Sequence, residues 1–433
     1  MKLKNRILFL LFIIFMSIQS ISYAIEPPPT QEEISGEAAI LMENETGKIL
    51  YEKNAYKKMY PASTTKVMTA LLALEKLDLD KKIAVPPDFP QVDGSSMYLL
   101  PGEEFTVNDL IRALLIHSSN DVAVLLAMEI SGSVEEFVKL MNERAVEIGC
   151  TGTHYSNPHG LHDDNHYTTV YDMALISREA MKNETFRKIV AEPILILEPT
   201  DKTPEKRIYN NTNRFLWSNE PIVYKNQYIP IKYDAVDGIK TGFTLEAQKC
   251  LASTGIKNGI RMIAVVYKTT EYDVFRDSRR LLDYGFDNFK IVKVLSAMEQ
   301  LGKETIKHSV QKDLKYAVTQ DISYITPIDT EVAYNQKIEL DELKLPIEKG
   351  QKVGKATITI GDDTKEYELV ALDDVESVFT FKHLKELITS KETNHIKRNI
   401  LIGIIVFIIL IIILRIVRAN IKRKKRKKRY KKL

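Results

Sequence analysis

The chain has 433 residues, of which 44% are hydrophobic and 27% are charged, enough for two folded domains with sizeable cores. The formal net charge is +3, but 12 Lys and Arg lie from residue 415 onward and three lie in the first 24 residues. The body between them has 46 basic and 58 acidic residues, a net charge of about −12, which excludes a nucleic-acid binder on charge.

The first 24 residues have the pattern of a secretory signal peptide. Three basic side chains precede an apolar run over residues 7–16, and the segment closes with small residues, the last of them Ala24. We expect residues 1–24 to be cleaved off after Ala24. An uncleaved N-terminal anchor is the alternative, and either reading predicts export.

The pattern over residues 32–289 predicts one domain. Residues 38–54 resemble two strands with a turn at 44–47, and residues 249–268 a hairpin turning at 257–259. Between these two pairs of strands, and again after the second pair, the sequence has helical periodicity. The segments are 63–80, 107–131, 134–149, 169–183 and 274–289. Strands at both ends with helices between them predict one α/β (α+β) sheet covered by helices.

The remainder of the chain has a different character. Residues 290–382 predict a small β-rich domain, with a hairpin that turns at 361–363. Residues 383–398 form a polar stalk, and residues 399–418 are apolar enough for a transmembrane helix, slightly short for a straight span. An interfacial helix is the alternative, but the segment has no polar face. The basic tail, 419–433, predicts a cytoplasmic C-terminus and an extracytoplasmic body.

Three short motifs carry the chemistry. Ser63 and Lys66 lie three residues apart at the start of a predicted helix, so they share one face. A serine needs a base to become a nucleophile, and a lysine serves only if its pKa falls. Such a pair alone is too common to indicate catalysis. Two further triplets follow, Ser118-Ser119-Asn120 and Lys240-Thr241-Gly242, and the three motifs in this order are typical of class A β-lactamases and penicillin-binding proteins.

Whole segments around these motifs extend the likeness. "YPASTTKVMTALLALE", "SSNDVAVLLAMEISGSVEEFVKLMNERA", "NPHGLHDDNHYTTVYDMALISREAM" and "VDGIKTGFT" resemble the serine-type D-alanyl-D-alanine carboxypeptidases, the low-molecular-weight penicillin-binding proteins. The likeness covers roughly residues 32–382. It implies a β-lactamase/transpeptidase-like catalytic domain and a C-terminal β-domain. It also implies a peptidoglycan stem peptide as substrate, β-lactams as inhibitors and no cofactor or metal.

The resemblance also implies roles for single residues. Ser63 would attack the penultimate D-Ala carbonyl, and Lys66 would take its proton. Ser118 would relay that proton to the leaving amine, and Asn120 would hold Lys66 and the acyl-side amide. On the third motif, Lys240 would also help to keep Lys66 neutral. The remaining expectations are a terminal carboxylate held by Lys240 and Thr241, a close backbone approach at Gly242, and an oxyanion hole from the N–H groups of Ser63 and Phe243.

The chain departs from the family pattern at several places. Ser119 stands where relatives often have Gly or Ala, and its side chain would crowd the cleft. Gln248 replaces a common Gly, and the segment 218–235 is longer than expected, predicting a loop at the edge of the cleft. Val274 occupies the position of an Arg that helps to bind the terminal carboxylate in many relatives, and Arg276 would substitute for it.

Other readings of the sequence remain open at this stage. Four histidines and two aspartates within residues 154–166 suggest zinc, and zinc D,D-carboxypeptidases exist, but the spacing of known zinc motifs is missing. Cys150 and Cys250 would form a disulfide or, as we favour, two buried thiols. The competing functions are a β-lactamase, for which no convincing deacylating glutamate is found, and a catalytically weak cell-wall binding protein.

Overall fold

The computed structural model describes residues 26–380 and 395–430, so the predicted signal peptide and most of the predicted stalk lie outside the described residues. The chain divides into two compact units, residues 1–292 with 323–331, and residues 293–322 with 332–433. The first unit contains the eight site residues that the sequence predicts.

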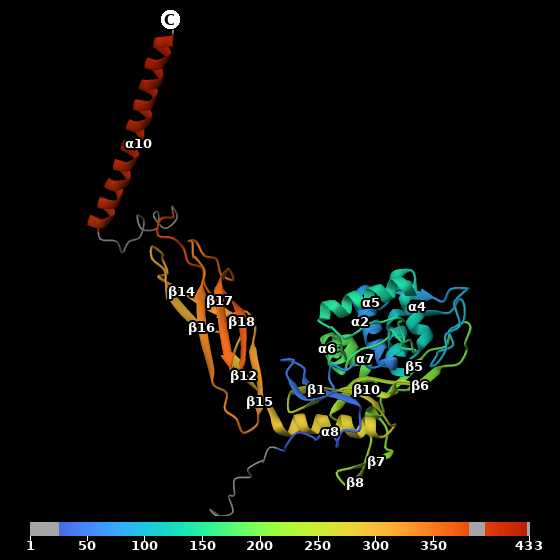
Figure 1. Cartoon of the computed structure of the whole chain (residues 1–433). Coiled ribbons are helices and arrows are strands. Elements are labelled where there is room, and N and C mark those ends of the chain that lie inside the picture. Colours follow the sequence, from blue (N-terminus) through green and yellow to red (C-terminus); the bar gives the residue numbers. More distant parts are fainter. Residues whose placement is uncertain (1–25, 381–394, 431–433) are drawn as a thin grey trace, which may run out of the picture. The chain divides into compact units, whose positions relative to one another are not determined.

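A five-stranded antiparallel sheet forms the centre of the first unit (Figure 1). Its strand order is β2-β1-β11-β10-β9, so β1, near the start of the unit, pairs with β2 on one side and with β11, far along the chain, on the other. The hairpins predicted at 44–47 and 257–259 are confirmed. The strands are β1 (Ala38–Glu43), β2 (Ile49–Lys53), β9 (Val236–Thr244), β10 (Gln248–Lys257) and β11 (Ile260–Thr269).

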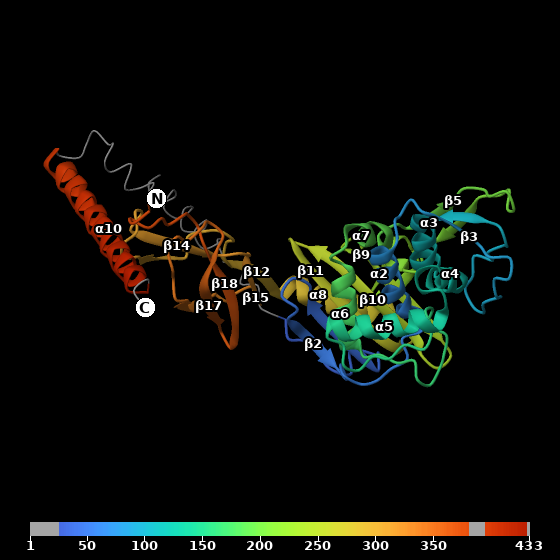
Figure 2. The ribbon, with the colours of Figure 1, turned by 90° about the horizontal axis from the view of Figure 1, so that it is seen from above.

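Helices cover both faces of this sheet, as the sequence predicts (Figures 1 and 2). Successive side chains of a strand point to opposite faces, and on β1 both sets are apolar. Ala39 and Leu41 pack in one cluster with α8 (Asp273–Asn288), whereas Ile40 and Met42 pack in another with α6 (Val170–Ala180). A strand buried on both sides explains why its sequence is almost uniformly apolar.

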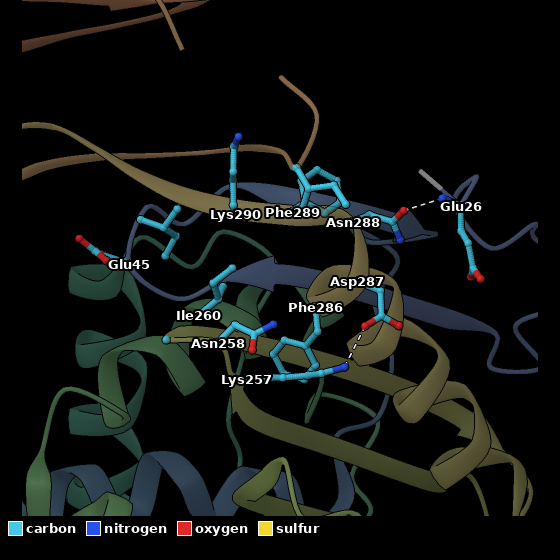
Figure 3. Close-up of a pocket in the computed structure, with 13 residues that line it drawn as sticks. Glu26, Glu45, Lys257, Asn258, Ile260, Phe286, Asp287, Asn288, Phe289 and Lys290 are labelled. Atoms are coloured by element: carbon cyan, nitrogen blue, oxygen red, sulfur yellow. Dashed lines mark hydrogen bonds and ion pairs between the residues drawn. The ribbon is translucent and has the colours of Figure 1, made fainter. Parts of the chain in front are cut away.

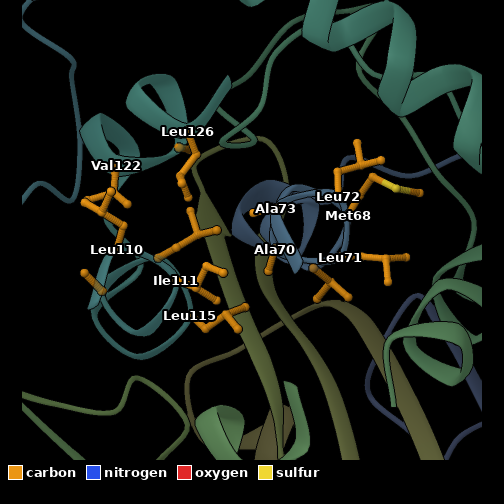
Figure 4. Packing of buried hydrophobic residues seen from close by; sticks show 14 of the residues in the cluster. Met68, Ala70, Leu71, Leu72, Ala73, Leu110, Ile111, Leu115, Val122 and Leu126 are labelled. Carbon is orange, nitrogen blue, oxygen red and sulfur yellow. The ribbon is translucent and has the colours of Figure 1, made fainter. Parts of the chain in front are cut away.

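The helix that follows Ser63 is deeply buried. Residues 66–73 of α2 (Lys66–Lys76) are all buried. Figure 4 shows Met68, Leu71 and Leu72 of this helix in the same apolar cluster as Leu110 and Leu126. Burial on all sides fixes the helix axis, so the residues at its N-terminus have a rigid support.

Further helices and small sheets complete the first unit. The helices are a 3₁₀ turn η1 (Ala62–Thr65), α3 (Val107–Arg112), a π-helical turn η2 (Ala113–His117), α4 (Asn120–Ser131), α5 (Val134–Ile148), α7 (Glu184–Val190) and a 3₁₀ turn η3 (Arg214–Leu216). Three two-stranded sheets pair β3 (Lys82–Ala84) with β4 (Glu104–Thr106), β5 (Ile194–Leu197) with β6 (Arg207–Asn210), and β7 (Pro221–Tyr224) with β8 (Gln227–Pro230). A fourth pairs β12 (Phe289–Leu295) with β15 (Ile322–Pro327), two strands that each include a boundary between the units.

The second unit is β-rich, as predicted, with no helix among its described residues before 395. Its five-stranded sheet has the order β13-β14-β18-β17-β16. The hairpin predicted at 361–363 joins β17 to β18. The strands are β13 (Gly302–Thr305), β14 (Asp313–Val318), β16 (Tyr334–Leu340), β17 (Lys352–Ile360) and β18 (Asp363–Ala371).

The chain ends in a long helix, α10 (His395–Tyr430). Residues Leu401–Lys422 within it are long and apolar enough to cross a membrane. No side chain in this stretch is buried by the rest of the chain, which fits a surface that contacts lipid.

Candidate active site

Ser63 and Lys66 meet at the junction between η1 and α2. Pro61 precedes the turn, whose 3₁₀ geometry brings residues three apart onto the same side. Lys66 Nζ lies 2.9 Å from Ser63 Oγ, within hydrogen-bond distance. The predicted pairing of a hydroxyl with an amine is therefore present in the structure.

Two further oxygens hold Lys66 in place. Its Nζ donates to Asn120 Oδ1 at 2.6 Å and to the carbonyl of His159 at 2.8 Å. Asn120 Nδ2 in turn donates to the carbonyl of Asp93 at 2.6 Å, which fixes the orientation of the amide. Lys66 is fully buried, and this burial, with the positive charge of Lys240, holds its pKa well below 10.5, although Asp121 opposes the shift.

The histidine-rich segment lies directly against the Ser63 turn. Gly160 has φ +90°, and a Cβ there would stand 1.8 Å from the carbonyl oxygen of Ala62. His166 Nδ1 accepts from the backbone N–H of Ser156, so its Nε2 carries the proton toward Thr65 Oγ1, 2.8 Å away. Within residues 26–380 and 395–430, no three His, Cys, Asp or Glu side chains are grouped to hold a metal ion.

The second motif lies where two helices meet at a sharp break. Ser118 adopts φ +71°, which ends η2 and allows α4 to start two residues later. Asp121 then accepts hydrogen bonds from the backbone N–H groups of Met97 and Leu99, each at 3.1 Å. These bonds tie the loop before β4 to the break, so Ser118 and Asn120 are held from two sides.

The third motif lies on β9, at the edge of the sheet. Lys240 is fully buried, its Nζ donates to Thr212 Oγ1 at 3.2 Å, and burial lowers its pKa to about 7. A Cβ added to Gly242 would stand 2.9 Å from the carbonyl oxygen of Pro61 and 3.1 Å from the backbone nitrogen of Ser63. Glycine therefore lets β9 lie against the Ser63 turn, which brings Phe243 close to it.

A cavity of about 410 Å³ joins the three motifs. It is bordered by Ser63, Ser118, Thr241, Gly242 and Phe243, while Lys66 and Asn120 lie behind Ser63, linked to it by hydrogen bonds. The sequence interpretation missed other residues of the border, which lie on segments without a motif. They are Ser95, Asn210, Asn211, Thr212, Arg214, Trp217, Lys249, Cys250, Glu271 and Phe275.

A larger pocket, of about 880 Å³, lies away from the motifs (Figure 3). Several of its lining groups are paired within the protein: Lys257 Nζ pairs with Asp287 at 2.8 Å, and the backbone N–H of Glu26 donates to Asn288 Oδ1 at 2.6 Å. None of the three motifs contributes to its lining, so the smaller cavity is the candidate active site.

Three expectations for the cleft were wrong. Ser119 does not crowd the cleft, because its side chain is fully buried and lies outside the cavity border. Arg276 does not replace the arginine missing at Val274, because its guanidinium pairs with Asp273 and Ser35 and does not border the cavity. Nor does the segment 218–235 border the cavity, since it folds into the β7–β8 hairpin.

The two cysteines match the favoured reading. Cys150 and Cys250 are buried free thiols, and burial raises the pKa of each to about 12. They are therefore inert core groups, although Cys250 also borders the cavity.

A serine hydrogen-bonded to a buried lysine, on a helix packed against a sheet, is the arrangement typical of the acyl-transferring, penicillin-recognising enzymes. The profile of the D-alanyl-D-alanine carboxypeptidase family matches residues 25–271, and that of the C-terminal domain of penicillin-binding protein 5 matches residues 289–377. The chain belongs to the D-alanyl-D-alanine carboxypeptidase family.

Individual relatives agree with this assignment. The D-alanyl-D-alanine carboxypeptidase DacF of Bacillus subtilis is 32% identical over 387 residues, which cover 87% of this chain and 95% of DacF. DacA of Haemophilus influenzae is 29% identical over 384 residues, which cover 85% of this chain and 91% of DacA. The crystal structure of penicillin-binding protein 5 from Haemophilus influenzae has a TM-score of 0.64 at 29% identity, covering 82% of this chain and all of that one.

Proposed function

We propose that the protein is a membrane-anchored serine D-Ala-D-Ala carboxypeptidase that removes the terminal D-alanine from peptidoglycan stem pentapeptides. Membership of the family and the names of the relatives support the reaction type. One observation supports the assignment of the site: Lys66 is buried, lies 2.9 Å from Ser63 Oγ and has its other contacts on two carbonyl-type oxygens.

Those two contacts have a chemical consequence. The Asn120 and His159 oxygens accept hydrogen bonds but cannot donate them. When Lys66 is neutral, its two N–H groups serve these oxygens and its lone pair faces Ser63. The lowered pKa of Lys66 favours this neutral form. The serine proton would then pass to Lys66 as the oxygen attacks the penultimate D-Ala carbonyl.

The remaining site residues complete the reaction in our proposal. The backbone N–H groups of Ser63 and Phe243 would stabilise the oxyanion, and Ser118 would carry the proton to the leaving D-alanine. Lys240 and Thr241 would bind the terminal carboxylate, and water would hydrolyse the acyl-enzyme. A β-lactam would acylate Ser63 by the same steps, and the resulting acyl-enzyme would be hydrolysed more slowly.

For location, we propose export by the signal peptide 1–24 and anchoring by the apolar helix near residues 401–422, with the basic tail in the cytoplasm. The test incubates the purified chain with a stem pentapeptide and with a fluorescent penicillin. Release of D-alanine and stable labelling, both lost in Ser63→Ala, are expected. Rapid hydrolysis of the penicillin would indicate a β-lactamase instead, and the absence of both would indicate a binding protein.

A further inference from the structure

One wall of the active-site cavity carries charges that the three motifs do not supply. Arg214, Lys249 and Glu271 all border the cavity together with Thr241. Arg214 Nη1 lies 3.4 Å from Glu271 Oε1, and Lys249 also pairs with Glu271. These three residues form the charged wall. Among the described residues of the border, they are the only ones with a formal charge.

The same wall contains the apolar Val274, which is only 2% exposed. A carboxylate that enters a partly buried cavity must be met by hydrogen-bond donors, since burial of an unpaired charge is costly. Valine offers none. A cation elsewhere on the wall would supply both the donors and the opposite charge for a carboxylate that binds beside Thr241.

Arg214 has the better geometry for this task. It lies on η3, two residues after Thr212, which contacts Lys240, so its segment is joined directly to the strand of the third motif. Its guanidinium lies 5.8 Å from the ring of Tyr272 and 5.9 Å from that of Phe275, which support the planar group from the side.

Carboxylates already hold Arg214 at the cavity. Besides Glu271 it pairs with Glu220, yet its side chain keeps 17% of its exposure. A guanidinium has five N–H donors in a fixed fork, enough to donate to two carboxylates of the protein and to a third from a ligand. Lys249 is a weaker candidate, because its ammonium lies 4.5 Å over the ring of Phe243 and is a point charge without a fork.

We propose that Arg214 binds the terminal carboxylate of the substrate, in place of the arginine that is missing at position 274. Glu220 and Glu271 orient the guanidinium, and Thr241, which borders the same cavity, lies beside the bound carboxylate. This inference rests on the proposed function, since that function supplies the substrate.

The test compares two ligands that differ in a single group: an N-acylated D-Ala-D-Ala dipeptide and its C-terminal amide. Binding of each is measured by calorimetry on the full chain in detergent, in a Ser63→Ala background that prevents turnover. We expect the parent to favour the acid. Arg214→Leu weakens binding of the acid about 10- to 100-fold, the range of a charge-assisted hydrogen bond, and leaves the amide unchanged. Arg214→Lys loses less.

Arg276→Leu is the matched control. It removes an arginine that lies two positions after Val274 but does not itself border the cavity. It should change neither affinity. The proposal is wrong if the parent binds acid and amide equally, if Arg214→Leu weakens both alike, or if Lys249→Ala and not Arg214→Leu removes the preference. D-alanine release by the chain with Ser63 intact is measured separately, so its failure would overturn the proposed function without deciding the role of Arg214.

Discussion

The two walls of the cavity are built on different principles. The first wall consists of Ser63, which borders the cavity, with Lys66 and Asn120 buried behind it; their polar atoms are paired within the protein at 2.6 to 2.9 Å. The charged wall of Arg214, Lys249 and Glu271 is partly exposed, with a contact of 3.4 Å between Arg214 and Glu271. A base must be desolvated and fixed to act, whereas a recognition group must keep donors available for a ligand. In our proposals, the first wall therefore performs the chemistry and the second selects the ligand.

Removal of the nucleophile gives the largest expected difference between the walls. Ser63→Ala should lower acylation by a fluorescent penicillin by roughly 10⁴-fold or more, because the covalent step is lost. The charged wall remains intact in this variant, so binding of the acid dipeptide should persist, as measured by calorimetry. A loss of both would show that the two walls are not independent.

Substitution of the base should have the next largest effect. Lys66→Met keeps the length of the side chain but removes the amine, and we expect acylation to fall about 10²- to 10⁴-fold, the usual contribution of a general base. The second-order rate of labelling by the penicillin measures it. Retention of the wild-type rate would show that another group takes the serine proton.

Displacement of the Ser63 turn should damage the first wall without removing any polar side chain. Gly160→Ala places a Cβ against the carbonyl of Ala62, and the shift of the turn should slow acylation by about 10²-fold, as an error near 1 Å does. Gly259→Ala is the matched control. The φ of Gly259 is +78°, but no atom lies within 4 Å of a Cβ added there, so the variant has the backbone strain without the collision. Equal labelling rates for the two variants would contradict this account.

The smallest effect concerns the pH dependence of stability. The pKa of Lys240 is about 7 in the folded chain, against about 10.4 when unfolded, so between these values the unfolded state binds more protons. Stability should therefore rise with pH from 7.5 to 9.5, by at most about 1.4 kcal/mol per unit for this one group. Lys66 acts in the same direction.

Lys240→Met should reduce that slope, since it removes the titrating group while leaving Lys66. Urea unfolding in detergent, followed by the fluorescence of Trp217, the single tryptophan, reports on the unit that contains both lysines. An unchanged slope in Lys240→Met would show that Lys240 keeps its charge in the folded chain.

The first wall could be predicted from the sequence, and the charged wall could not. Ser63 and Lys66 are joined by helical spacing, and the sheet, its two hairpins and the covering helices follow from periodicity. Arg214 reaches the cavity through contacts with Glu220 and Glu271, the latter 57 residues away, and no local pattern encodes such a contact.

The failed prediction for Arg276 has a simple cause. Two residues along an α-helix correspond to a rotation of about 200°, so a side chain at 276 cannot face the cavity that Val274 borders. Sequence proximity suggested a replacement that helical geometry forbids. Ser119 was misjudged for a related reason, since the reversal at Ser118 directs its neighbour into the core.

The contacts of Lys66 also set the order in which the chain becomes reactive. Its two carbonyl-type partners lie 54 and 93 positions further along the sequence. Contacts of such long range form late, after the loops between them have closed. If Lys66 activates Ser63 as we propose, a newly made chain has no activated serine until all three segments have folded together, and a partly folded chain would neither cut a peptide nor be acylated by an antibiotic.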